Sequence, residues 1–135
     1  MRFVIVGCGR VGARLALELC QENEVTVVDW SRRSFDRLGD RFTGETTLGN
    51  GIDVDVLRSA GVQNADMFFA LTDGDNRNLM AAQVAAQLGA PRVVARVYDP
   101  VRCNVFGDMG IMTVSPTING AERLFQMIEA GEEAR

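Results

Sequence analysis

Continuous apolar runs alternate with segments of helical period along the whole chain. Runs such as FVIV, MFFA and RVVARV are apolar without alternation, which is typical of strands buried on both faces of a parallel sheet. The pattern predicts six strands, over residues 2–6, 25–29, 46–48, 67–71, 92–97 and 111–114. With helices between them, these strands indicate the α/β class and a doubly wound, Rossmann-like parallel sheet of order 3-2-1-4-5-6. We expect a single domain over residues 1–130 and a short tail over 131–135.

The helices are predicted from apolar residues spaced three and four apart. The first helix starts near residue 11 and the helix after the fourth strand covers 75–88. Their expected buried faces carry, respectively, Val11, Leu15 and Leu19, and Leu79, Ala82 and Ala86. Short polar residues at the starts of helices predict N-caps, namely Ser31, Asp73 and Asp75.

The last predicted helix, over residues 117–130, carries more apolar surface than one face requires. By the 3.6-residue period its apolar residues cover about half of the circumference, against a usual stripe of about 100°. These residues are Ile118, Ala121, Leu124, Phe125, Met127 and Ile128. The surplus needs a partner, and we expect a second copy of the chain to supply it, so that this is a dimerising C-terminal helix.

A glycine-rich loop connects the first strand to the first helix. Its pattern G-x-G-x-x-G comprises Gly7, Cys8, Gly9, Arg10, Val11 and Gly12. Such a loop allows a tight turn, a close approach of backbone N–H groups to a diphosphate, and close packing of helix on strand. The helix N-terminus adds the positive end of its dipole. Asp29 ends the second strand, where its carboxylate would accept hydrogen bonds from ribose hydroxyls and repel a 2′-phosphate. These residues predict NAD(H) or ATP/ADP rather than NADP.

Two side chains in this loop have alternative interpretations. Arg10 is either a solvated surface charge or a guanidinium beside the phosphates. Cys8 is either a small residue at a free position or a thiol whose pKa the helix N-terminus lowers.

Further binding residues are expected at the carboxyl ends of the other strands, where ligands bind in open α/β sheets. Trp30 would stack on an adenine or close the edge of the core, and Asn76 would bind a ribose or its own loop. Arg96 lies in an apolar run and needs an anionic partner, either a ligand phosphate or a carboxylate such as Asp99. The remaining candidates are Asn50, Gly51, Ile52, Leu71 and Thr72.

The composition narrows the function. The chain of 135 residues has a formal net charge of −4, so that no basic surface for nucleic acid is expected. Its three cysteines are widely spaced and there is no histidine, which argues against disulfides, a zinc site and the commonest general acid–base. No stretch has the ~20 apolar residues of a membrane span and the first residues lack a signal-peptide pattern, so we expect a cytoplasmic location and no metal site.

Several segments together resemble the RCK (KTN, TrkA-N) domain family. They are VIVGCGRVGARLA, VTVVDW, LGNGID, LRSAGVQNADMFFALTDGDNRN, VVARVYDP and FGDMGIMTVSP, and the resemblance covers residues 1–130. Family members are cytosolic nucleotide-binding regulators of potassium channels and Trk/Ktr transporters. The resemblance implies a homodimer or higher ring, a membrane potassium transporter or channel subunit as partner, and a place at the inner face of the membrane.

The resemblance also assigns roles to residues. The three glycines match the phosphate loop, Asp29 the ribose carboxylate and Arg10 an arginine that reaches phosphate near the dimer interface. Thr72, Asn76 and Arg96 match positions that line the nucleotide cleft. Two positions depart from the family: Asn50 stands where an aspartate is usual, and Thr117 replaces an acid that some members use in binding a cation. The family's C-terminal ligand-binding domain usually begins where this chain stops.

Three functions remain open from the sequence. The first is a regulatory module that binds an adenine nucleotide and gates a membrane potassium transporter, with Arg10 and Arg96 reading the phosphates. The second is a small NAD-dependent oxidoreductase, for which the chain offers no evident substrate domain or proton donor. The third is an assembly platform that has lost ligand binding.

Overall fold

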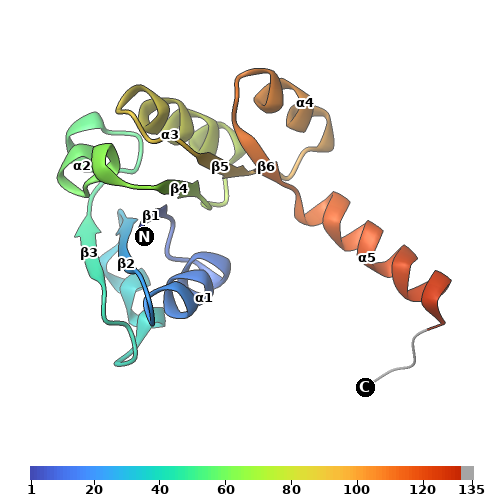
Figure 1. Cartoon of the computed structure of the whole chain (residues 1–135), viewed down its shortest axis with the longest axis horizontal. Coiled ribbons are helices and arrows are strands. Elements are labelled where there is room, and N and C mark those ends of the chain that lie inside the picture. Colours follow the sequence, from blue (N-terminus) through green and yellow to red (C-terminus); the bar gives the residue numbers. More distant parts are fainter. Residues whose placement is uncertain (132–135) are drawn as a thin grey trace.

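The computed structural model describes residues 1–131, and its centre is a six-stranded parallel sheet (Figure 1). The strand order is β3-β2-β1-β4-β5-β6, as the sequence predicts. The strands are β1 (Arg2–Val6), β2 (Glu24–Asp29), β3 (Glu45–Leu48), β4 (Met67–Ala70), β5 (Val93–Arg96) and β6 (Met112–Val114). Each boundary lies within one residue of the predicted strand. Residues 132–135 of the predicted tail lie outside the described part of the chain.

Helices connect the strands and cover the sheet (Figure 1). They are α1 (Arg10–Leu19), the 3-10 helix η1 (Arg32–Leu38), α2 (Val54–Ser59), the 3-10 turn η2 (Val62–Asn64), α3 (Asp75–Gln87), α4 (Pro100–Asp108) and α5 (Pro116–Ala130). No helix within residues 1–131 combines the length and the apolar character that crossing a membrane requires.

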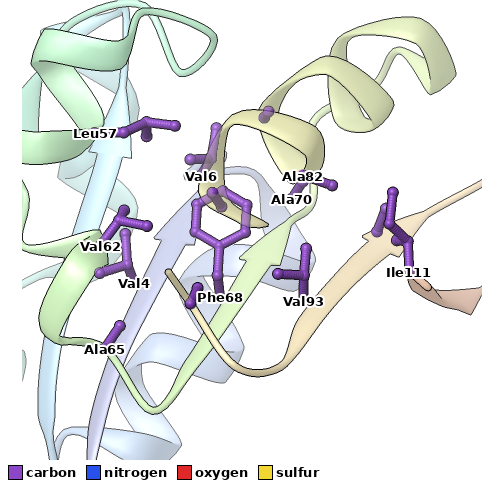
Figure 2. Packing of buried hydrophobic residues seen from close by; sticks show 14 of the residues in the cluster. Val4, Val6, Leu57, Val62, Ala65, Phe68, Ala70, Ala82, Val93 and Ile111 are labelled. Carbon is purple, nitrogen blue, oxygen red and sulfur yellow. The ribbon is translucent and has the colours of Figure 1, made fainter. Parts of the chain in front are cut away.

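The two faces of the sheet carry separate cores because successive side chains on each strand point to opposite sides. On β1, Val4 and Val6 face the core beneath α2, α3 and α4, while Phe3 and Ile5 face the core beneath α1 and η1. Figure 2 shows the first of these cores, in which the ring of Phe68 lies among Val4, Val62, Val93 and other apolar side chains. Burial on both faces explains the uninterrupted apolar runs of the sequence.

The two predicted helix faces are confirmed in part: Leu15 and Leu19 of α1 pack against one core, and Leu79 and Ala82 of α3 belong to the other. Val11 and Ala86 are wrong. Val11 is half exposed, and the buried side of α1 is formed by Ala13, Ala16 and Cys20. Ala86 is exposed on α3, where Ala81, Ala82 and Ala85 are buried. In both helices small residues face the sheet, because they allow the helix backbone to approach the strands closely. The periodicity of the larger apolar residues therefore locates the core side of each helix but misses most of the small residues at its centre.

Of the three predicted N-caps, Ser31 occupies the N-cap position of η1, whereas the predictions for Asp73 and Asp75 are wrong. Ser31 precedes η1 but its side chain makes no capping hydrogen bond, and Gly74 occupies the N-cap position of α3. The carboxylate of Asp75 instead accepts hydrogen bonds from the backbone N–H groups of Tyr98 and Asp99, at 2.7 and 3.1 Å. Asp75 thus ties the start of α3 to the chain beyond β5.

The helix α5 projects away from the rest of the molecule (Figure 1). None of its residues is buried. Leu124, Phe125 and Ile128 are 63 %, 60 % and 77 % exposed, although the 3.6-residue period places all three on one side of the helix. The apolar surplus predicted from the sequence is therefore present in the structure as an uncovered face.

Candidate functional site

The glycine loop leads from β1 directly into the N-terminus of α1. Gly7 has a positive φ of 105°, and its N–H donates to the carbonyl of Val28 at 2.8 Å. Gly9 occupies the N-cap position and provides no side-chain cap. The first N–H groups of α1 have no partners within a helix, so they and the positive end of the helix dipole are available to an anion at this point.

Asp29 is fixed beside this loop by two hydrogen bonds. One carboxylate oxygen accepts from the backbone N–H of Cys8 at 2.8 Å, and the other accepts from that of Ser31 at 2.9 Å. A carboxylate oxygen has two acceptor positions, so Asp29 retains capacity to accept hydrogen bonds from a ligand. The end of β2 therefore places a negative charge directly beside the anion-binding loop.

These groups open into a cleft of about 470 Å³ at the carboxyl ends of the strands. Its volume is that of an ordinary small-molecule site, within the usual range of about 300–1,000 Å³. Most of the residues predicted from the sequence line the cleft: Gly7, Cys8, Gly9, Arg10, Asp29, Trp30, Asn50, Gly51, Ile52, Leu71 and Thr72. Gly51 is needed here, because a Cβ at this position would lie 2.3 Å from Cγ1 of Val6.

The other four predicted residues do not line the cleft. Val11 lies on the exposed side of α1. Gly12 packs beneath the loop, where a Cβ would lie only 1.9 Å from the carbonyl oxygen of Gly7. Asn76 is exposed and accepts a hydrogen bond from Arg102. Gly12 thus acts on the shape of the loop, while Asn76 belongs to a surface contact between α3 and α4.

Arg96, the fourth, is buried, and its carboxylate partner is Asp73 instead of Asp99. Its Nη2 atom donates to the carbonyl oxygens of Leu71 and Thr72, at 2.8 and 3.0 Å. Asp73 lies 3.7 Å away and the ring of Tyr98 stacks at 5.1 Å, whereas Asp99 instead caps α4 and pairs with Arg102. Arg96 therefore holds the end of β4 in place instead of facing the cleft.

Asn78 is a structural centre of the site that the sequence analysis missed. It is fully buried, and its Oδ1 accepts from the backbone N–H and the hydroxyl of Thr72, at 2.9 and 2.6 Å. Its Nδ2 donates to the carbonyls of Thr72 and Arg96, at 3.0 and 2.9 Å. Asn78 lies two residues after Asn76 in the same segment, and it is Asn78 whose amide contacts the end of β4. The one available signal was the helical period, which places position 78 with the buried Ala81, Ala82 and Ala85.

Four further polar residues, Ser34, Arg37, Asp73 and Arg77, line the cleft although the sequence did not predict them as binding residues. Ser34 and Arg37 come from η1, and Arg77 from the first turn of α3. Nη1 of Arg37 donates to the carbonyl of Cys8 at 3.3 Å. With Arg10, the cleft thus has three guanidinium groups around it, against the carboxylates of Asp29 and Asp73. No sequence motif pointed to Arg37 or Arg77.

The environment of Cys8 disfavours the thiolate, which is the reactive form of a cysteine. Burial, and secondly the charge of Asp29, raise the pKa of Cys8 to about 11, with Arg37 acting weakly in the other direction. The interpretation of Cys8 as an activated thiol is therefore wrong.

We expect Cys8 to resist alkylation by iodoacetamide in the folded protein at pH 8. Only about 0.1 % of the thiol would be ionised there, and the thiolate is the reacting form. Peptide mapping by mass spectrometry measures the modification of each cysteine, and unfolded protein provides the fully reactive control. Labelling of Cys8 at the same rate in folded and unfolded protein would contradict this environment.

Comparison with known proteins places this geometry in a family. The sequence profile of the TrkA-N domain matches residues 3–116. The Trk system potassium uptake protein TrkA of Streptomyces coelicolor is 43 % identical over 136 residues, spanning 98 % of this chain and 61 % of that protein. This chain therefore spans less than two thirds of that relative's length.

Two solved structures share the fold. The Kef CTD of Shewanella denitrificans in AMP-bound form has a TM-score of 0.78 at 20 % identity, covering 98 % of this chain and 84 % of that one. The GsuK channel bound to NAD has a TM-score of 0.72 at 20 % identity, covering 84 % of this chain and 21 % of that one. Similarity at this identity shows a common architecture. The match to the domain profile over most of the sequence shows more: this chain belongs to the TrkA-N domain family.

Proposed function

We propose that the cleft binds an adenine nucleotide, NAD(H) or ATP/ADP, and that the chain is a regulatory module of a Trk-type potassium uptake system. The observation that carries the proposal is the arrangement of Gly9, the open N-terminus of α1 and Asp29 around one cleft. The loop offers N–H groups to phosphate and the carboxylate offers acceptors to ribose hydroxyls. The AMP and NAD in the two structural neighbours support this ligand class.

The regulatory part of the proposal concerns how the binding of a nucleotide affects a partner protein. The relative's name supports a potassium uptake system, and we place the chain in the cytoplasm, at the inner face of the membrane beside a transporter or channel subunit. A ligand shifts a conformational equilibrium only through different affinities for the two states. Arg10 lines the cleft and is exposed, so it is the residue whose contacts would differ between nucleotides with different numbers of phosphates. Arg96 has no such role, because it is buried and does not line the cleft.

A regulatory role is favoured over catalysis. The cleft is lined by arginines, aspartates, small polar residues and backbone, and the sequence contains no histidine. The thiol of Cys8 is held in its neutral form by burial, which raises its pKa to about 11. The cleft therefore lacks histidine, the side chain that most often serves as a general acid or base.

Calorimetric titration with AMP, ADP, ATP, NAD, NADH and NADP tests the nucleotide proposal. We expect the nucleotides without a 2′-phosphate to bind, and NADP to bind at least about tenfold more weakly than NAD, because Asp29 repels the extra phosphate. In Asp29→Ala this difference should shrink. Asp36→Ala removes the same charge from the exposed surface of η1 and should leave the difference unchanged. No binding by any of the six compounds would overturn the proposal.

We further propose that α5 pairs with a second copy of the chain, in a homodimer or a higher ring. The face formed by Leu124, Phe125 and Ile128 is exposed. Apolar residues are also uncovered on β6, where Met112 and Val114 are 43 % and 39 % exposed. Exposed apolar surface of this extent is a mark of an interface, and two copies of one helix face can satisfy each other by twofold symmetry.

Replacement of Phe125 by aspartate is expected to convert a dimer to a monomer. A charge in the centre of the paired apolar faces would lose its hydration without gaining a partner. Sedimentation velocity measures the state, and Gln126→Asp, one position away on the polar side of α5 by the helical period, should leave the dimer intact. A wild-type chain that sediments as a monomer at high micromolar concentration would contradict the pairing.

A further inference from the structure

Trp30 and Arg77 face each other across the mouth of the cleft. Trp30 follows directly after β2 and Arg77 lies in the first turn of α3, so they come from opposite sides. The guanidinium carbon of Arg77 lies 5.6 Å from the centre of the indole ring. Both residues line the cleft, and Trp30 is 74 % exposed. An indole with three quarters of its surface in water contributes little to the core, which leaves its position unexplained by packing.

The order of groups along the cleft indicates which part of a nucleotide would reach this pair. Phosphate is drawn to the N-terminus of α1 at Gly9. The carboxylate of Asp29 repels phosphate and accepts from hydroxyls, so the ribose comes next. Trp30 is the following residue in the chain and lines the same cleft. The base is therefore the part of the ligand that arrives at Trp30, with Arg77 on the other side.

Resting on the nucleotide binding proposed above, we propose that the purine base is held between the indole of Trp30 and the guanidinium of Arg77. Planar groups in contact lie about 3.5 Å apart, so a base between the two needs about 7 Å. The present separation of 5.6 Å is too small. The two side chains are in contact when the cleft is empty, and the base enters by displacing one of them.

Arg77 is the side chain that moves. It is an exposed residue on the surface of α3, and its contact with an exposed ring is worth only about as much as a surface cation–π pair. A guanidinium is planar and stacks on aromatic faces, which an ammonium does not do in the same way. The base thus exchanges one weak contact between Trp30 and Arg77 for two stacking contacts of its own. Arg77 would recognise the base by stacking, while Arg10 would recognise phosphate by charge.

Fluorescence reports on this site directly, because Trp30 is the single tryptophan of the chain. We expect the emission of Trp30 to be quenched on titration with AMP, with a midpoint that agrees with the calorimetric dissociation constant. Ribose 5-phosphate contains no base and should bind without comparable quenching.

Variants separate stacking from charge. Trp30→Ala is expected to weaken AMP binding by about fivefold to a hundredfold, the range measured for loss of one stacked base. Arg77→Ala should weaken AMP binding by about threefold to thirtyfold. Arg77→Lys should recover little of this affinity, because lysine restores the positive charge but not the planar group that stacks on the base. Neither variant should change the affinity for ribose 5-phosphate. Arg14→Ala removes a matched, exposed arginine from α1 and serves as the control.

The outcomes distinguish this inference from the nucleotide proposal. Binding of AMP with unchanged Trp30 emission, or with wild-type affinity in both Trp30→Ala and Arg77→Ala, overturns the base site and leaves nucleotide binding in place. Loss of ribose 5-phosphate affinity in Arg77→Ala assigns Arg77 to phosphate and overturns the base site equally. Absence of AMP binding to the wild-type chain by calorimetry overturns both.

Discussion

Replacing Gly12 by alanine is expected to destabilise the protein by about 3 kcal/mol or more, at or above the upper end of usual overpacking costs. The new Cβ would lie 1.9 Å from the carbonyl oxygen and 3.1 Å from the carbonyl carbon of Gly7. Both are backbone atoms, so no rotation of a side chain can relieve the contact. Either α1 moves away from β1 or the loop changes its path, and both changes remove N–H groups from the cleft. Urea denaturation measures the free energy of unfolding, and calorimetry the loss of nucleotide binding.

Gly9 provides the matched control for Gly12. A Cβ at Gly9 meets no atom within 4 Å, and its φ of −85° is open to any residue. Gly9→Ala should therefore cost only about 1 kcal/mol, the usual penalty of alanine at an N-cap position. Because Gly9 lines the cleft, its added methyl group should still weaken nucleotide binding. If Gly12→Ala were as stable as Gly9→Ala, the close packing of α1 on the loop would be contradicted.

The second large effect is expected at Asn78. Asn78→Leu should cost about 3–5 kcal/mol, because each buried polar group left without a partner costs about 1–3 kcal/mol. The backbone N–H and the hydroxyl of Thr72 lose their acceptor, and the carbonyl of Arg96 loses its donor. Leucine fills a similar volume, so the loss reports the hydrogen bonds more than a cavity.

Asn76→Leu is the control for Asn78, since it changes the same residue type two positions away on the exposed side of α3. It should shift the free energy of unfolding by no more than about 0.5 kcal/mol. Denaturation of both variants in urea gives the comparison. Equal stability of Asn78→Leu and wild type would contradict the central position of Asn78 in the site.

The sheet could be predicted from the sequence because its signal is redundant. Five of the six strands have an apolar run, the exception being β3 with the sequence ETTL, and together with the glycine loop and Asp29 they admit few topologies. The residues of the cleft that belong to strand ends were also predictable, because the carboxyl edge of a parallel sheet brings strand ends together. Thr72, Asn50 and Trp30 were found in this way.

What escaped prediction depends on the helices and on side-chain direction. Arg37 and Arg77 reach the cleft from η1 and α3, and the sequence does not show how far these helices tilt toward it. Most of the small residues at the centre of the buried sides of α1 and α3 were missed. For Arg96 the sequence indicates an anionic partner, and the carboxylate of Asp73 lies 3.7 Å from its Nη2 atom. The two backbone carbonyls that accept hydrogen bonds from the same atom could not be predicted. Hydrogen bonds to the backbone leave no trace in the sequence.

The position of a bound nucleotide is the central claim, and backbone amide NMR during titration with AMP tests it most directly. We predict that the amide signals of Gly9, Arg10 and Trp30 shift and saturate together. Signals from Asn23 and Asn64, which precede β2 and β4 at the opposite edge of the sheet, should stay in place. Shifts that saturate at the amino ends of the strands while the glycine loop is unaffected would contradict the claim, as would the absence of shifts at millimolar AMP.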